Sequence, residues 1–337
     1  MNGHRRDDWN PFDVATLKEL RLGTFGSNRF GEPEYVPSTV FAVAPEGVYV
    51  DGYGAAMTLV ALGGGAFHMG SVDERAYPAD GEGPVHVVEL APFRMDAHAV
   101  TNARFGEFFD ATGHVTEAEQ FGWSFVFAGL LPDDFMDTRG VAGSEWWRQV
   151  EGADWRHPEG PQSDLDGRQD HPIVHVSWND AQAFCAWSGT RLPTEAEWEF
   201  AARGGLEGMA FPWGDELEPD GRHMMNVFQG TFPSANSCAD GFAGTAPVDT
   251  FEPNGYGLYN MTGNVWEWSA DWFDPTTYLH GDRRDPTGPE QGASRVMRGG
   301  SYLCHQSYCR RYRVSARSAN TPDSSTGNLG FRVASNA

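Results

Sequence analysis

The feature that most constrains this chain is a pair of cysteines, Cys304 and Cys309, within a block rich in glycine and arginine. An odd offset places two side chains on opposite faces of a β-strand. On an α-helix the same offset leaves them more than a third of a turn apart. The thiols therefore meet only if the segment from His305 to Tyr308 bulges or turns. A disulfide, a redox pair and a soft-metal clamp all need such a turn, whereas two unrelated buried cysteines do not.

Composition bounds the class of protein. The chain has 337 residues, enough for one large domain or two ordinary ones with a sizeable core. Its 41 glycines, 21 prolines and 12 tryptophans predict many turns, with large aromatic side chains between the loops. The net charge of −23 argues against nucleic acid as a partner and favours a basic peptide or a cation. A solvated acidic surface without a partner is the alternative.

Nothing in the sequence indicates export or membrane insertion. The first nine residues are charged and polar, and no apolar stretch follows them. The most apolar run, residues 55–67, contains three consecutive glycines and is too short to span a bilayer. Four cysteines are too few for a disulfide scaffold. We therefore expect a cytoplasmic protein without membrane contact.

Two regions differ in organisation. Residues 1–56 have little periodicity apart from one short helix expected over 13–22, and we regard them as an extension of unknown role. Met57 is an alternative natural start. Residues 57–335 are expected to form one domain.

Three helices are predicted in this domain from their capping residues. Thr101 precedes a helix over 102–111, and Ser177 precedes a helix over 178–187. Thr194 and Glu197 form a capping box that begins a helix to about Arg203.

Short strands surround these helices. Strands are expected over 58–62, 66–69, 85–90 and 173–176, and residues 115–170 are expected to be loops. The whole is a mixed α+β domain with little regular secondary structure.

Other polar residues have simpler explanations. His171 and His175 are expected to be structural hydrogen-bonding groups, since Pro172 opposes a helical metal motif. The capping box explains Glu197, and we expect Glu195 and Glu199 to be exposed to solvent. Cys185 is predicted to be a buried apolar side chain and Cys238 is assigned no role.

Oxygen-bearing side chains also gather in Gly-rich turns, at Asn226, Asp240, Asn260 and Glu267. Such loops offer the oxygen ligands that Ca²⁺ prefers. Ordinary Asx turns are the favoured explanation from these residues alone.

Several motifs together resemble the formylglycine-generating enzymes, also called sulfatase-modifying factors. Two blocks mark the wider superfamily: R-L-P-T-E-A-E-W-E at 191–199 and G-N-V-W-E-W at 263–268. The C-x4-C block with its flanks is more specific. Further matching segments are 155–161, 175–180, 254–260, 299–313, 316–325 and 328–332. The resemblance covers about 58–334.

The resemblance implies a C-type-lectin-like α+β fold and an oxidase. Such an enzyme converts the cysteine of a C-x-P-x-R motif, in an unfolded sulfatase peptide, into Cα-formylglycine with O₂ and Cu(I). By position, Cys304 and Cys309 would be the copper ligands. Ser301, Trp266 and Asn328 would line the oxygen and substrate pocket. A monomer is expected.

The same resemblance implies two structural Ca²⁺ sites. The residues of the first would be Asn226, Val227, Asp240 and Phe242, with Val227 and Phe242 contributing carbonyls. Those of the second would be Asn260, Gly263, Val265 and Glu267, with Gly263 and Val265 contributing carbonyls.

Two other functions are compatible with such a fold. A non-heme iron sulfoxide synthase needs an H-x-x-x-H-x-E motif, but Val176 and Ser177 follow His175 here. A non-catalytic lectin-like binding module would leave Cys304 and Cys309 without a role.

Overall fold

A computed structural model describes residues 49–50 and 56–337 of the chain. The helix expected over 13–22 and nearly all of the expected extension lie outside the described residues. Strand β1 (Tyr49–Val50) pairs antiparallel with β2 (Ala56–Met57). The boundary that we expected between residues 56 and 57 therefore lies inside β2.

The three capped helices are confirmed. They are α2 (Asn102–Thr112), α4 (Trp178–Ser188) and α5 (Glu195–Arg203). The side chains of Thr101, Ser177 and Thr194 each accept a hydrogen bond from a backbone N–H of the first turn, and each helix is followed by a glycine in the left-handed conformation.

Shorter helical segments complete the helical part. They are η1 (Pro78–Asp80), α3 (Glu117–Phe121), η2 (Ala128–Leu130), η3 (Pro219–Gly221) and α6 (Thr277–His280). Among the described residues, no helix is both long and apolar enough to cross a bilayer.

The strands form several small sheets. A four-stranded sheet has the order β14-β13-β12-β15, in which β12 and β15 run parallel and the other neighbours antiparallel. Its strands are β12 (Trp266–Trp272), β13 (Arg295–Arg298), β14 (Ser318–Asn320) and β15 (Leu329–Gly330). A three-stranded antiparallel sheet comprises β16 (Ala334–Asn336), β6 (Phe93–Asp96) and β3 (Leu59–Leu62).

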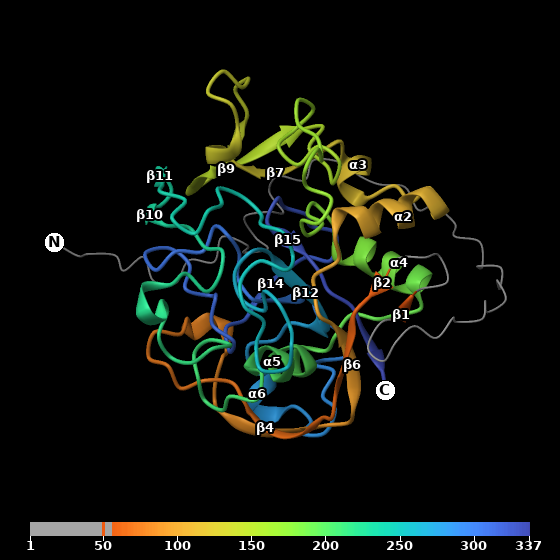
Figure 1. Cartoon of the computed structure of the whole chain (residues 1–337), viewed down its shortest axis with the longest axis vertical. Coiled ribbons are helices and arrows are strands. Elements are labelled where there is room, and N and C mark those ends of the chain that lie inside the picture. The colour runs from red at the N-terminus through yellow and green to blue at the C-terminus, as the bar shows by residue number, and fades with distance from the viewer. Residues whose placement is uncertain (1–48, 51–55) are drawn as a thin grey trace.

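Three further small sheets are present among the described residues. Strand β4 (Gly65–Met69) pairs with β5 (His86–Leu90), and β10 (Gly230–Thr231) pairs with β11 (Ala235–Asn236). Strand β9 (Ser144–Glu151) lies between β7 (Trp123–Phe127) and β8 (Arg139–Val141). In Figure 1 the β7–β9 pair lies at the top, α5 and β4 lie toward the bottom, and β12 and β14 lie between them.

Two expectations about secondary structure were wrong. Residues 115–170 contain α3 and the β7–β9–β8 sheet, so they are not only loops. Residues 173–176 do not form a strand, because His175 has φ of 59° and the left-handed backbone interrupts an extended segment.

Charged side chains lie inside the core. Arg298, Arg317 and Arg332 are fully buried, as are Trp198, Trp266 and Trp268. Glu195 and Glu199, which we expected at the surface, are also buried and form ion pairs with Arg298, Arg317 and Arg203. Burial opposes the ionisation of Glu195, but Arg317 and Arg298 outweigh it and lower the pKa of that carboxyl. These ion pairs connect α5 to β13 and to the residue that precedes β14.

Candidate active site

A tight turn brings the two cysteines together. The N–H groups of Tyr308 and Cys309 both donate to the carbonyl of His305, over 2.9 and 2.7 Å. The Sγ atoms of Cys304 and Cys309 lie 3.1 Å apart, and both thiols are free. The turn expected between the cysteines is therefore present.

Both cysteine side chains are buried, and the pKa values of the two thiols differ. Cys304 is 1 % exposed and Cys309 3 %. Burial raises the pKa of Cys304 well above its ordinary value. Burial also opposes the ionisation of Cys309, but the hydrogen bond from Cys304 and the charge of Arg311 lower its pKa to about 7. The Cys304 thiol therefore donates a hydrogen bond to the Cys309 sulfur, which ionises near neutral pH.

Ser301 and Asn328 contact each other beside this pair. The Asn328 amide donates to Ser301 Oγ over 2.8 Å, and its Oδ1 accepts from Thr326 Oγ1 over 2.7 Å. The N–H of Ser301 lies 3.4 Å from Cys304 Sγ. The β12–β15 pairing places Trp266 here too, since its N–H donates to the Asn328 carbonyl over 2.9 Å. All five residues expected at the catalytic site thus lie in one buried region.

Residues 77–82 pack against the cysteine block, a contact that the sequence analysis did not predict. Asp80 pairs with Arg311, at 2.5 Å between Oδ2 and Nε, and Glu82 pairs with Arg313 at 2.7 Å. The hydroxyl of Tyr77 contacts the backbone on both sides of Cys309. The run of arginines after Cys309 was a signal that acidic partners are required, but nothing local indicated which segment supplies them.

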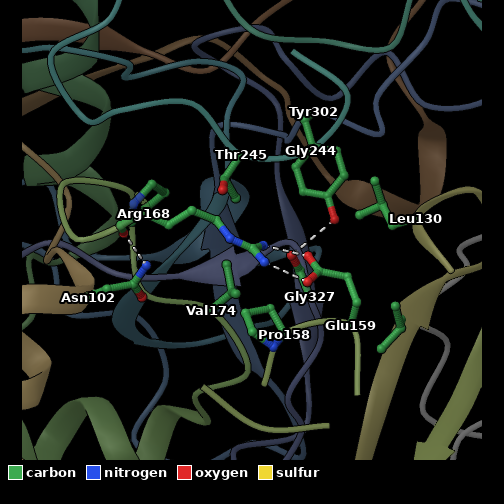
Figure 2. Close-up of a pocket in the computed structure, with 12 residues that line it drawn as sticks. Asn102, Leu130, Pro158, Glu159, Arg168, Val174, Gly244, Thr245, Tyr302 and Gly327 are labelled. Carbon is green, nitrogen blue, oxygen red and sulfur yellow. Dashed lines mark hydrogen bonds and ion pairs between the residues drawn. The ribbon is translucent and has the colours of Figure 1, made fainter. Parts of the chain in front are cut away.

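A cavity of about 200 Å³ adjoins the same backbone (Figure 2). Tyr302 and Gly327, the neighbours of Ser301 and Asn328, line it and are joined by a 3.1 Å hydrogen bond from the tyrosine hydroxyl to the glycine carbonyl. Arg168 reaches across the cavity to pair with Glu159 through two hydrogen bonds of 2.7 and 2.9 Å.

The histidines have structural partners, as expected. His175 is fully buried between Ser124 Oγ and the carbonyl of Pro158, each at 2.8 Å. Burial lowers its pKa to about 4, so the ring is neutral at pH 7. His171 contacts Thr245 Oγ1. Cys185 is buried on α4, which confirms that expectation too.

Residues of the first expected calcium site lie close together. The carboxylate of Asp240 accepts hydrogen bonds from the N–H groups of Val227 and Phe242, each over 3.1 Å. The Asn226 amide nitrogen donates to the carbonyl of Gly244 over 2.8 Å. In these contacts both carboxylate oxygens of Asp240 face N–H donors, whereas a calcium ion requires oxygen ligands.

The second expected calcium site is only partly suitable. Asn260 Oδ1 and Thr262 Oγ1 are buried, have no hydrogen-bond partner among the described residues, and belong to side chains that line a cavity of about 170 Å³. Glu267 differs, because its carboxylate accepts hydrogen bonds from Arg332 and from Trp198 Nε1. Among the described residues of this segment, the side-chain oxygens left without a hydrogen bond are therefore Asn260 Oδ1 and Thr262 Oγ1.

Within the described part of the chain, no group of three or more His, Cys, Asp and Glu side chains could hold a metal ion. Among these residues, the Cys304–Cys309 pair is therefore not part of a larger cluster of metal-ligating side chains. A mixed α+β frame built of short strands, with a buried dithiol turn, defines a C-type-lectin-like protein of the sulfatase-modifying-factor class.

The chain belongs to this family: the model of the sulfatase-modifying factor enzyme 1-like domain matches residues 52–337. The formylglycine-generating enzyme of Streptomyces coelicolor is 60% identical over 279 residues, which cover 82% of this chain and 89% of the relative. The structure of PvdO from Pseudomonas aeruginosa superposes with a TM-score of 0.60 at 26% identity, and the match covers 88% of this chain and 100% of PvdO.

The family also includes a relative whose name describes it as inactive. A relative from Bos taurus named inactive C-alpha-formylglycine-generating enzyme 2 is 47% identical over 293 residues, 85% of this chain and 90% of the relative.

Proposed function

We propose that this protein is a copper-dependent formylglycine-generating enzyme. It would oxidise the cysteine of a C-x-P-x-R motif, in an unfolded sulfatase peptide, to Cα-formylglycine with O₂. The observation that carries the proposal is the buried pair of free thiols, Cys304 and Cys309, with sulfurs 3.1 Å apart. The name of the 60% identical relative supports it.

The residues present fit Cu(I). Soft thiolates select this ion over harder divalent metals. Cys304 and Cys309 would hold it, and Arg311 supplies positive charge beside the thiolates. A pair of protein ligands leaves room for the substrate thiol as a third. Bound copper would supply the one-electron chemistry that O₂ requires.

The chain's own groups would prepare the site. Ser301 and Asn328 form a short polar pair beside Cys304, suited to orient a small polar reactant. Burial of both thiols excludes water from the reacting atoms. The net charge of −23 favours approach of a peptide that carries arginine.

The overall reaction balances with an external reductant. One substrate thiol, one O₂, two electrons and two protons give one aldehyde, one H₂S and one water. Loss of one hydrogen from the substrate Cβ and of the thiol hydrogen, with their two electrons passing to O₂, gives a thioaldehyde, and its hydrolysis releases the sulfide.

Two structural calcium ions are part of the proposal. The first would bind Asp240, Asn226 and the carbonyls of Val227 and Phe242. The second would bind Asn260 Oδ1 and the carbonyls of Gly263 and Val265, with Glu267 retained by Arg332. An unpaired buried acceptor is costly unless a ligand satisfies it, and this supports the second site.

We further propose that the enzyme acts in the cytoplasm as a monomer. All four of its cysteines are free, which suits a reducing compartment.

The experiment that tests this function is mass spectrometry of a C-x-P-x-R peptide incubated aerobically with Cu(I)-loaded protein and a reductant. Exchange of H₂S for oxygen, with an aldehyde reactive to hydrazide, is the expected product. An unchanged peptide with copper bound would refute the assignment.

A further inference from the structure

We infer that Tyr77 is a positioning residue for the copper ligand Cys309, an inference that rests on the proposed function. Tyr77 immediately precedes η1 and lies more than 200 positions away from the cysteine block in sequence. Its hydroxyl donates to the carbonyl of Tyr308 over 3.4 Å and accepts from the N–H of Arg310 over 3.1 Å.

These two contacts act on the peptide groups that flank Cys309. The Tyr308 carbonyl belongs to the peptide unit before the Cys309 Cα atom, and the Arg310 N–H belongs to the unit after it. A residue has two soft backbone torsions, and each peptide unit is planar. Because one oxygen atom holds both units, it restricts both torsions of Cys309 and hence the direction of its Cα–Cβ bond.

The other thiol is held independently. The N–H of Cys304 donates to the Ser301 carbonyl over 2.8 Å, and the N–H of Ser301 lies 3.4 Å from the Cys304 sulfur. Local backbone contacts with Ser301 therefore fix the position of Cys304. The position of Cys309 depends on the turn at His305 and on the contact with Tyr77, which is distant in sequence.

Neighbouring contacts anchor Tyr77 itself. The guanidinium of Arg311 lies over its ring at 3.9 Å and pairs with Asp80. Arg310 donates to the Arg75 carbonyl over 2.6 Å. The ring is therefore held by contacts that do not involve its hydroxyl, and Tyr77→Phe should remove only the two backbone contacts.

The test compares the full-length parent with Tyr77→Phe. The control is Tyr256→Phe, whose ring stacks on Phe200 in a core cluster that excludes the cysteines. Cu(I) alone is the first probe, with its affinity measured by competition against a chromogenic Cu(I) chelator. The second probe is a glutathione redox buffer, in which each protein disulfide formed from the two thiols and oxidised glutathione releases two reduced glutathione molecules.

We expect Tyr77→Phe to weaken Cu(I) binding about five- to tenfold, as loss of two ordinary hydrogen bonds implies. The equilibrium for closing the Cys304–Cys309 disulfide should fall by a similar factor, while Tm matches that of Tyr256→Phe. Values within twofold of the parent in both assays, or equal losses in Tyr256→Phe, would overturn the inference.

The two probes distinguish failure of the proposed function from failure of the inference about Tyr77. A parent protein that does not bind Cu(I) would refute the copper enzyme. The glutathione equilibrium, which needs no metal, would then decide the role of Tyr77 by itself.

Discussion

Asp80 and Arg311 form a buried ion pair with a 2.5 Å separation between Oδ2 and Nε, although 231 positions separate them in sequence. This pair joins η1 to the segment that follows Cys309. Burial raises the pKa of Asp80 even with Arg311 beside it, so the intact pair contributes little net stability.

Removal of one partner of this ion pair is expected to destabilise the folded protein. Asp80→Asn leaves the Arg311 charge buried without its carboxylate, and we expect the free energy of unfolding to fall by about 3–5 kcal/mol. Denaturant unfolding measures this. Glu89→Gln, which removes the carboxylate partner of the exposed Arg284, is the matched control and should leave the midpoint unchanged. Equal midpoints for the Asp80 variant and the control would contradict the expectation.

The dithiol predicts a specific pattern of copper binding. Cys304→Ala and Cys309→Ala should each weaken Cu(I) binding more than about a hundredfold, since even outer-shell changes at metal sites cost up to that factor. Cys238→Ala, in a half-buried loop, removes a thiol outside the pair and should bind like the parent. Competition titration with a Cu(I) chelator provides the measurement. Parent-like affinity in both paired variants would show that the ligands were wrongly assigned.

Calcium removal should destabilise the protein. A site saturated at a hundredfold excess over its Kd contributes about 2.7 kcal/mol, so EDTA should lower Tm by a few degrees. Asp240→Asn and Asn260→Ala should each reduce this response, because each removes an oxygen ligand from a different site. The control is Asn179→Ala. The native Asn179 donates to Glu117 at the surface, outside both proposed calcium sites, so this variant should respond like the parent. A parent Tm that is indifferent to EDTA would exclude both sites.

His175 predicts a pH dependence of stability. Its pKa is about 4 in the folded protein and about 6.5 when unfolded, so the unfolded chain binds the extra proton between these values. The contribution to stability is complete above pH 6.5 and is lost as the pH falls toward 4. Between pH 7.5 and 4.5 the parent should lose about 2–3 kcal/mol more than His175→Gln. The same loss in both proteins, by denaturant unfolding at the two pH values, would contradict it.

Local signals in the sequence were sufficient for some features. Thr101, Ser177 and Thr194 predict their helices because capping depends on residues within one turn. The offset between Cys304 and Cys309 requires a turn only if the two thiols meet, and the sequence left open whether they do.

Other features depend on distant contacts. Glu195 and Glu199 resemble exposed helix residues until the arginines from β13 and the segment near β14 reach them. Tyr77 carries no local sign of its role, because its partners follow Cys309. The β7–β9–β8 sheet was missed for another reason: Trp123, Phe125 and Phe127 lie on one face of β7, but Ser124 and Val126 on the other face are buried too, so the strand lacks the alternation of a half-exposed strand.

We propose that the Cys304–Cys309 site oxidises a peptidyl cysteine. The most direct measurement is mass spectrometry of a C-x-P-x-R peptide after aerobic incubation with the Cu(I)-loaded parent and reductant, beside Cys309→Ala and a peptide with serine in place of cysteine. We expect an aldehyde product, formed by exchange of H₂S for oxygen, only with the parent and the cysteine peptide. An unmodified peptide with copper bound, or equal product from Cys309→Ala, would contradict it.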